Sequence, residues 1–422
     1  MNERIAAISK YNLWDGNVIE TGYERPIYTT NIMRYCGNRV IKVLCGQRRS
    51  GKSYIMRQIA SELIRQGVES NNILFINSEF TAFDFLATYK DLDELIQLYE
   101  KELHPQGRRY LFIDEVQDID GWERTINSYA QDYTAEYEIF ITGSNSTMLS
   151  SELSTLLSGR YVTFNIFPLS YREYSTINSL AIGKQGYMQY MSGGGFPELI
   201  NLHGTDIRQH YISGLKDTIL LKDIIQRHTV KDSKLLEDIF AYLVNNAANL
   251  LSIANITNYF KSRGRKTSYE TVAAYIGYIE EAYLVHRADR FNIKGKEIIS
   301  GTYKYYTNDL SFHNFLYSGT GYGIGYMLEN LIYLELLRAG YSVCVGSIKD
   351  KEVDFVARKN DRIIYIQSTY ILIDETTTVR EYAPLEAIDD HYEKYVVSLD
   401  EVELPSRNGI RHIQAWRLDE IL

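Results

Sequence analysis

The residues with the most specific chemistry lie at positions 46–53, which read Gly-Gln-Arg-Arg-Ser-Gly-Lys-Ser. This is a complete GxxxxGKS phosphate loop, and it stands between an apolar strand-like run, 40–45, and the start of a helix-like run. Gly46 and Gly51 let the backbone curl so that amide groups point at phosphate oxygens, and the following helix adds its positive amino-terminal end. The pattern predicts that the chain binds a nucleoside triphosphate.

Two side chains of this loop have defined roles in that chemistry. We expect Lys52 to reach the β and γ phosphates and the Ser53 hydroxyl to bind Mg²⁺. For the arginines inside the loop, Arg48 and Arg49, a solvated position and a phosphate contact are equally compatible with the sequence. The residues predicted to bind the nucleotide are Gly46, Arg49, Ser50, Gly51, Lys52, Ser53 and Tyr54.

An acidic pair follows a second apolar run and predicts hydrolysis in addition to binding. Residues 110–113 are continuously apolar, as expected for a strand that is covered on both faces of a parallel sheet, and the run ends in Asp114 and Glu115. Asp114 would hold Mg²⁺, usually through water, because this small cation prefers oxygen ligands. Glu115 would polarise the attacking water. The alternative is a strand that ends in two solvated acids.

Two further residues are weaker candidates for the same site. The strand-like run 138–142 opens into a polar turn in which Asn145, or Ser144 beside it, could orient the lytic water, although an ordinary turn has the same composition. Arg160 follows a helix-like stretch, 149–157, and precedes the strand-like run 161–167. It could reach the nucleotide of a neighbouring subunit as an arginine finger, or it could cap the negative end of the helix.

Motifs along most of the chain resemble those of bacterial and archaeal AAA-type ATPases that carry a C-terminal domain of unknown function. The motifs that carry this resemblance are GQRRSGKS, LFIDEVQDIDGWE at 111–123, ITGSNSTMLSSELSTLLSGRYVTFNIFPLSYREY at 141–174, GGGFPEL at 193–199, ENLIYLELLRAGY at 329–341 and EVDF at 352–355. The resemblance implies a five-stranded parallel P-loop core with an acidic strand tip, the cofactors ATP and Mg²⁺, and hydrolysis. It implies no settled biological role.

Composition agrees with a multidomain intracellular protein. The chain has 422 residues, too many for one ordinary core, and its 45 basic and 54 acidic residues give a net charge of −9. That charge offers no global attraction to nucleic acid, so any DNA contact must be local. Three cysteines without CxxC spacing argue against a disulfide framework and a zinc site. No segment approaches the apolar length of a membrane helix, and we expect a soluble, cytoplasmic protein.

The predicted fold class is α/β, with a parallel-sheet P-loop ATPase domain followed by two smaller parts. Changes of pattern divide the chain into an ATPase domain at 1–170, a helical connector at 171–231, a winged-helix-like domain at 232–310 and an α/β restriction-endonuclease-like domain at 311–422. The chain has six prolines, so proline-rich linkers do not mark the domain boundaries. The glycine run 193–195 lacks a following lysine, so it is interpreted as a rigid turn and not as a phosphate cradle.

The winged-helix-like part contains the clearest local basic cluster. Two short helical runs are followed by the turn 261–266, Lys-Ser-Arg-Gly-Arg-Lys, and by a third helical run, 269–282. The turn could meet DNA phosphates at a helix start. The third helix, however, carries Glu270, Glu280 and Glu281, which would repel DNA. DNA binding and a structural or protein-docking role are therefore equally open.

The last part of the chain looks like the restriction-endonuclease-like fold with a defective site. In that fold an acidic helix residue, a strand Asp and an acid-x-Lys pair gather Mg²⁺ and activate water. Glu329 and Asp354 take the first two places, but the pair reads Gln367-x-Thr369. We therefore expect a nuclease-like fold without strong nuclease activity, in which these groups hold a weak metal or, with more weight, satisfy one another as buried polar groups.

Taken together, the sequence predicts an ATP-hydrolysing AAA-type switch that is coupled to a DNA- or protein-interaction module. A second hypothesis is a nucleic-acid or partner binding module in which ATP is a slow structural ligand. A third is a weakly active Mg²⁺-dependent nuclease with a displaced basic residue. A protein partner and a homo-oligomer, in which Arg160 would act in trans, are both compatible with the sequence.

Overall fold

The computed structural model describes residues 2–145, 157, 159–317, 323–372 and 374–422. The chain divides into two compact units, Met1–Phe167 and Pro168–Leu422. The helix expected at 149–157 lies outside the described residues, apart from Leu157. Each unit has its own sheet and its own core, and the two are described separately.

The first unit is built on a five-stranded, fully parallel sheet, as predicted. Its strand order is β2-β3-β4-β1-β5. The strands are β1 Ile41–Cys45, β2 Ile73–Asn77, β3 Arg109–Asp114, β4 Tyr137–Gly143 and β5 Tyr161–Asn165. Every residue of β1, β2 and β4 is buried, which explains why these strands are mostly apolar and do not alternate with polar residues.

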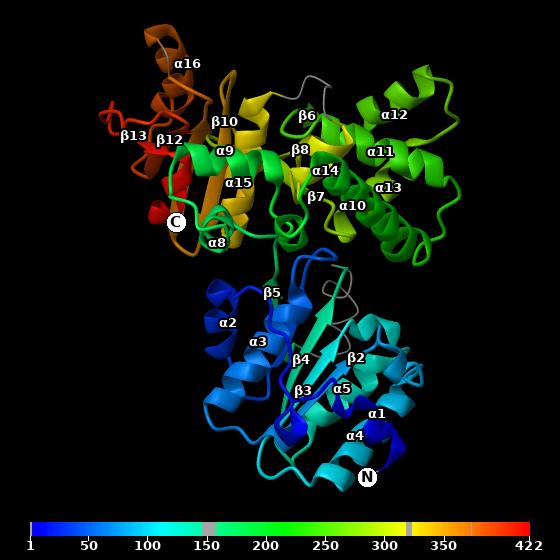
Figure 1. Ribbon diagram of the computed structural model, residues 1–422. Coiled ribbons are helices and arrows are strands. Elements are labelled where there is room, and N and C mark those ends of the chain that lie inside the picture. The colour runs from blue at the N-terminus through cyan, green and yellow to red at the C-terminus, as the bar shows by residue number, and fades with distance from the viewer. Residues whose placement is uncertain (1, 146–156, 158, 318–322, 373) are drawn as a thin grey trace. The chain divides into compact units, whose positions relative to one another are not determined.

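Helices cover both faces of this sheet (Figure 1). They are α1 Glu3–Ser9, α2 Pro26–Met33, α3 Lys52–Arg65, α4 Tyr89–Leu103 and α5 Trp122–Gln131, with the short 3₁₀ turns η1 Trp14–Gly16, η2 Ser70–Asn72, η3 Thr81–Phe83 and η4 Val116–Asp118. Ile55, Met56 and Ile59 of α3 pack in one cluster with Phe112 and Phe140 of the sheet. This packing fixes the start of α3 above the end of β1.

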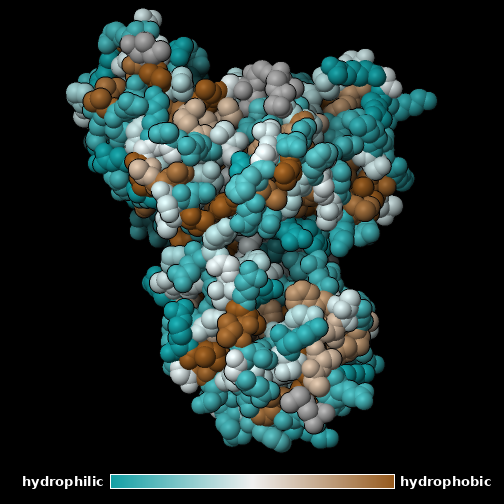
Figure 2. All heavy atoms as spheres, viewed as in Figure 1, coloured by the Kyte–Doolittle hydropathy of each residue, from teal (hydrophilic) through white to brown (hydrophobic). Residues whose placement is uncertain are grey.

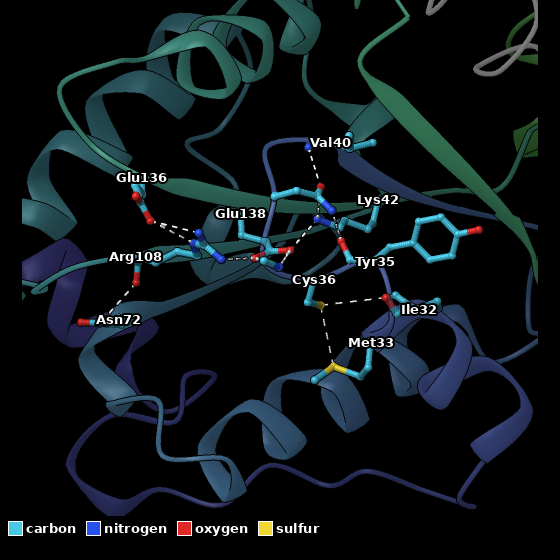
Figure 3. Close-up of polar contacts among 12 residues, drawn as sticks. Ile32, Met33, Tyr35, Cys36, Val40, Lys42, Asn72, Arg108, Glu136 and Glu138 are labelled. Atoms are coloured by element: carbon cyan, nitrogen blue, oxygen red, sulfur yellow. Dashed lines mark hydrogen bonds and ion pairs between the residues drawn. The ribbon is translucent and has the colours of Figure 1, made fainter.

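A buried ion pair crosses the sheet near the amino ends of its strands (Figure 3). Lys42 of β1 and Glu138 of β4 have side chains that are 0% exposed, and the Lys42 Nζ lies 2.5 Å from the Glu138 Oε1. The second oxygen, Oε2, accepts a hydrogen bond from the Gly37 amide at 3.0 Å and one from Arg108 at 3.4 Å. Because the phosphate loop follows the carboxyl end of β1, this pair lies at the opposite edge of the sheet.

The second unit begins with helices in the segment predicted as a connector. These are α8 Tyr171–Ile177, α9 Lys184–Gly193, the 3₁₀ turn η5 Pro197–Ile200, α10 Thr205–Thr218 and the π-helical turn η6 Ile219–Ile225. The glycine run 193–195 forms no phosphate cradle. Instead the Gly195 amide donates to the buried carboxylate of Asp309 at 2.7 Å, and a Cβ on Gly194 would lie 2.5 Å from the same carboxylate.

The rest of the second unit is one eight-stranded mixed sheet with helices around it (Figure 1). The strand order is β13-β12-β11-β10-β9-β7-β8-β6. The strands are β6 Leu250–Leu251, β7 Val285–Asn292, β8 Glu297–Thr307, β9 Ser342–Ile348, β10 Lys351–Lys359, β11 Arg362–Ser368, β12 Glu393–Ser398 and β13 Arg411–Gln414. The helices are α11 Ser233–Asn245, α12 Ile253–Ser262, α13 Tyr269–Glu281, α14 Ser311–Leu316, α15 Ile324–Arg338, α16 Glu375–Glu386 and the 3₁₀ turn η7 Ala415–Ile421.

One pairing joins the two parts that the sequence separates at residue 310. Strand β7, from the winged-helix-like part, pairs in parallel with β9, from the nuclease-like part, through Arg290 with Val345 and Phe291 with Gly346. Helical and strand periodicity could not show this contact, because it depends on which edge strands meet in space. The segments 232–310 and 311–422 therefore share a single sheet.

Apolar side chains reach the surface only in separated patches on the face that Figure 2 shows, with hydrophilic residues between them. Among the described residues, no helix has the length and apolar character needed to cross a membrane.

Candidate nucleotide-binding site

The phosphate loop connects β1 to α3 with a backbone that only glycine can adopt at two positions. Gly46 has φ 154° and Gly51 has φ 100°. A Cβ on Gly46 would lie 2.1 Å from the backbone carbonyl oxygen of Ile166, so any side chain there would push the loop away from the end of β5. Arg49 is held at φ 68°, an uncommon conformation for a residue with a Cβ. The loop is therefore curled as the sequence predicts.

Lys52 points into this curl. Its side chain is 3% exposed, and its Nζ donates to the carbonyls of Gly46 at 3.0 Å and Gln47 at 3.2 Å. The same Nζ lies 3.6 Å from the Glu115 Oε1. The ammonium thus lies between the phosphate loop and the end of β3, where a phosphate bound in the loop would meet it.

The hydroxyl group of Ser50 indicates whether the loop suits a phosphate. Its hydroxyl oxygen is buried, and within the described residues it has no hydrogen-bond partner. A buried hydroxyl without a partner costs about 1–3 kcal/mol, so such an atom usually marks a position that a ligand or water satisfies. The loop therefore has a donor available for an oxygen atom, in agreement with a bound phosphate.

Asp114, the last residue of β3, is fully buried and firmly oriented. One carboxylate oxygen accepts from the Thr142 hydroxyl at 2.6 Å, and the other accepts from the Asn77 amide at 2.8 Å. Burial, followed by the charge of Glu115, raises the pKa of Asp114 to about 6, while hydrogen bonds from Thr142 and Ser53 oppose that rise. A buried carboxylate close to the Ser53 hydroxyl is a suitable pair of oxygen ligands for Mg²⁺.

Glu115 follows Asp114 in a strained conformation. Its φ is 53° and its ψ is 49°, a left-handed conformation that residues with a Cβ rarely adopt. The Thr142 hydroxyl accepts a hydrogen bond from the Glu115 amide at 2.8 Å, and the Gln117 amide donates to the Glu115 carboxylate. This turn directs the carboxylate toward Lys52 and away from the strand axis.

The other predicted site residues divide into two groups. Asn145 is buried two residues beyond the end of β4, at the edge of the sheet that carries the phosphate loop. Tyr54 lies in the first turn of α3 with its ring against Gly22. Arg160 is not brought to this site, because its carbonyl accepts from the amide of Ile41 at the amino end of β1, the opposite edge of the sheet. Within one chain it cannot act on a nucleotide in the loop.

Three residues that position the site were not found from the sequence. Asn77 and Thr142 hold the Asp114 carboxylate, and the Arg25 guanidinium donates to the Ser50 carbonyl at 2.8 Å. A polar residue at the end of an apolar strand was the available signal for Asn77 and Thr142. No local pattern distinguished Arg25, which lies in the segment before α2.

The residues predicted for the second, nuclease-like site do meet in space. Glu329 of α15, Asp354 of β10 and Gln367 of β11 are all buried, and the Gln367 Oε1 accepts from the Asp354 amide at 3.4 Å. The sequence indicated that no lysine remained there. The acid-x-Lys pair does lack its lysine at Thr369, but a lysine from another strand is present, because Lys304 of β8 places its Nζ 2.8 Å from the Glu329 Oε1.

The basic turn 261–266 is exposed apart from the partly buried Arg265. Arg265 forms an ion pair with Asp238 of α11, and the Arg263 guanidinium lies over the Tyr259 ring, 4.3 Å from its centroid. Ser268 caps α13 by accepting from the Thr271 amide. One of the two arginines is thus neutralised within the unit.

The segment that contains the site matches a known family. Residues 38–175 match the family described as "AAA domain", and residues 184–321 match a domain of unknown function, DUF8612. Among solved structures, the Walker-type ATPase PABY2304 of Pyrococcus abyssi is 15% identical and covers 68% of this chain and 94% of its own, with a TM-score of 0.42. The Orc1 protein of Aeropyrum pernix, solved in complex with DNA, is 12% identical and covers 75% and 97%, with a TM-score of 0.31.

Two relatives extend over nearly the whole chain. An uncharacterized protein of Haemophilus influenzae is 34% identical over 402 residues, which cover 93% of this chain and 98% of that protein. The uncharacterized protein MJ1544 of Methanocaldococcus jannaschii is 31% identical over 386 residues, which cover 86% and 81%. With a P-loop ATPase fold in its first unit and relatives of this extent, the chain belongs to the family of AAA-domain proteins that includes these two uncharacterized proteins.

Proposed function

We propose that the protein is a Mg²⁺-dependent ATPase whose nucleotide state controls the C-terminal unit. The observation that carries this proposal is the meeting of Lys52, Asp114 and Glu115 at one edge of the sheet, with the Lys52 Nζ 3.6 Å from the Glu115 Oε1. Phosphoryl transfer requires positioned cations and carboxylates more than covalent chemistry, and these three residues supply them.

Each residue has a separate task in this proposal. Lys52 binds the β and γ phosphates, and Ser53 with Asp114 holds Mg²⁺, which when bound neutralises phosphate charge. Glu115 orients and polarises the attacking water, and Asn145, which is buried beyond the end of β4, assists it. The strained backbone of Glu115 supports this role, because such conformations concentrate at functional sites.

Two substitutions separate binding from turnover. Lys52→Ala should abolish ATP binding, whereas Glu115→Gln should retain binding and lose hydrolysis by about 100-fold or more, since a lost general base typically costs 10²–10⁴. Binding is measured with a fluorescent ATP analogue, and turnover by phosphate release. Glu69→Gln, a change of the same chemistry at an exposed position, is the control. Equal turnover for the wild type and Glu115→Gln would remove the catalytic assignment.

The element order of 232–310 supports a second candidate, a DNA-binding C-terminal unit. Helix α11, strand β6, helices α12 and α13 and the β7–β8 hairpin follow one another as in a winged helix, and the exposed turn 261–266 precedes α13. Arg263 is exposed at this turn with its guanidinium over the Tyr259 ring, whereas Arg265 forms an ion pair with Asp238.

The two arginines therefore provide a matched test of DNA binding. Arg263→Glu should weaken binding to a short duplex and reduce its salt dependence. Arg265→Ala should chiefly affect folding stability, because the guanidinium is engaged within the unit. Unchanged affinity and salt dependence in Arg263→Glu would exclude this turn as the contact and favour a protein partner. Arg160 stays a proposed finger acting between subunits, and light scattering with and without ATP tests the assembly that it requires.

A further inference from the structure

A cluster of charged side chains lies inside the second unit, where three strands and one helix converge. It consists of Lys304 of β8, Glu352 and Asp354 of β10, Gln367 of β11 and Glu329 of α15, and we call it the Lys304 cluster. Apart from Glu352, every member is buried. Helix α15 packs against β8, β9, β10 and β11, so the cluster lies in the interior of one folded unit.

The Lys304 ammonium lies at the point where the carboxylates converge. Its Nζ is 2.8 Å from the Glu329 Oε1, 2.7 Å from the Glu352 Oε1 and 3.9 Å from the Asp354 Oδ1. The first two distances are those of charge-assisted hydrogen bonds. An ammonium has three N–H donors. In this cluster the carboxylates of Glu329 and Glu352 accept two of them, and the carboxylate of Asp354 lies 3.9 Å from the same Nζ.

Two carboxylates of the cluster accept further hydrogen bonds. The Glu329 Oε1 accepts a second hydrogen bond, from the Tyr306 hydroxyl at 2.7 Å. The Asp354 Oδ2 accepts from the amide of Ser368 at 2.7 Å and from its hydroxyl at 2.8 Å. These donors fix the carboxylates in the orientation that surrounds the ammonium.

The residues present do not fit the divalent metal that the restriction-endonuclease-like resemblance implies. Mg²⁺ demands close to octahedral oxygen ligands at about 2.0–2.1 Å, whereas these oxygens surround a nitrogen at hydrogen-bond distance. In the restriction-endonuclease-like site the lysine accompanies a metal that the carboxylates hold, whereas here the Lys304 Nζ itself lies at hydrogen-bond distance from two of the carboxylates. Within the described chain, no group of three or more His, Cys, Asp or Glu side chains is arranged to hold a metal ion. Gln367, moreover, supplies an amide where a carboxylate would be needed.

We propose that Lys304 is the resident cation of this site and takes the place of a divalent metal. Three carboxylates and one lysine leave the cluster with an excess of negative charge if all are ionised. Burial, followed by the charge of Asp354, raises the pKa of Glu329 to about 8. Near neutral pH a proton on Glu329 therefore removes part of the excess negative charge of the cluster. The cluster thus ties α15 to the sheet without a metal, and the unit acts as an interaction module and not as a Mg²⁺-dependent nuclease.

The test measures Mn²⁺ binding by electron paramagnetic resonance in the full-length protein without nucleotide. Every variant carries Asp114→Asn, which removes the metal ligand of the phosphate loop and keeps that site from contributing. With Lys304 present, we expect no Mn²⁺ binding that depends on Asp354. Lys304→Ala should bind one Mn²⁺ ion at least about tenfold more tightly than the protein that retains Lys304, because a charge repulsion has been removed. Asp354→Asn should abolish that gain.

Either of two results would overturn the proposal. One is Mn²⁺ binding in the presence of Lys304 that is lost on Asp354→Asn, and the other is a folded Lys304→Ala variant that gains no Mn²⁺. If Lys304→Ala fails to fold, the proposal is still tested by comparing Mn²⁺ binding with and without Asp354→Asn in protein that retains Lys304. Mg²⁺-dependent cleavage of plasmid by the otherwise unchanged protein, lost on Asp354→Asn, would likewise contradict it. None of these readouts depends on ATP turnover, so they can fail while the proposed ATPase stands.

Discussion

The guanidinium of Arg25 donates a hydrogen bond to the carbonyl of Ser50, 2.8 Å away inside the phosphate loop. The same Nη1 donates to the carbonyl of Phe167, the last residue of the first unit, at 3.0 Å. Arg25 is 2% exposed, and its backbone amide is held by the Gln58 side chain at 3.1 Å. A single buried donor therefore couples the shape of the loop to the point where the chain leaves the ATPase unit.

Replacing Arg25 should weaken nucleotide binding through the loop. Arg25→Met removes the donor from two buried carbonyls, and we expect a loss of about 1–3 kcal/mol in the free energy of unfolding and at least about tenfold weaker ATP binding. Urea denaturation and ATP titration measure the two effects. Arg65→Met, on the exposed end of α3, should change neither. Unaltered ATP affinity in a folded Arg25→Met variant would show that the loop keeps its shape without this contact.

Gly46→Ala should abolish ATP binding with little unfolding of the sheet. The added Cβ would meet the Ile166 carbonyl oxygen at 2.1 Å, so the loop must move. Gly67→Ala is the matched control, since Gly67 also has a positive φ, of 92°, but an added Cβ there has no atom within 4 Å. ATP titration of both variants separates the clash from simple backbone strain. Equal affinities would contradict the assignment of Gly46 to the cradle.

Asp114 should make the nucleotide-free protein less stable as the pH rises through the range from about 4 to 6. Burial and Glu115 raise its pKa from the ordinary value of an aspartate to about 6, so in this range the folded state holds a proton that the unfolded state has released. By linkage, stability falls as that proton is lost, and above the raised pKa the cost is about 1–3 kcal/mol.

Asp114→Asn should therefore raise the melting temperature at about pH 7.5 without nucleotide, and the gain should shrink as the pH falls below 6. Addition of ATP and Mg²⁺ should stabilise the wild type more than the variant, because the variant lacks the metal ligand. Scanning calorimetry across this pH range measures both effects. A variant that is less stable than the wild type at every pH would show that the hydrogen bonds of Asp114 outweigh its burial.

The buried pair Lys42 and Glu138 should show strong coupling. Lys42→Met alone leaves the buried Glu138 carboxylate with only the longer ion pair to Arg108 and should cost about 3–5 kcal/mol, whereas the double change Lys42→Met with Glu138→Leu should recover a large part of that loss. Urea denaturation of the single and double variants gives the coupling energy. The exposed pair Arg65 and Glu62 provides the control, with an expected coupling below about 1 kcal/mol. Additive losses at Lys42 and Glu138 would show that their contact contributes nothing of its own.

The sequence predicted those parts of the site that are local in the chain. The strand, loop and helix around residues 46–53 follow one another directly, and so do the apolar run and acids that end in Glu115. Asn77 could not be assigned, because its relation to Asp114 depends on the register of β2 against β3, which places the two residues opposite each other. Lys304 was missed for the same reason, since it reaches Glu329 only through folding of the second unit. Residues that position a site from a distant strand have no characteristic separation from it in the sequence, so no motif predicts them.

The pairing of β7 with β9 determines how the protein can be divided for study. A fragment that ends near residue 310 would lose β9 and leave the backbone amides and carbonyls of Arg290–Asn292 without their partners. Unpaired strand edges of this kind recruit other chains, so such a fragment would tend to aggregate. Within the part of the chain that the structure describes, no strand pairing crosses the boundary between Phe167 and Pro168, and we expect fragments cut there to express as separate soluble proteins.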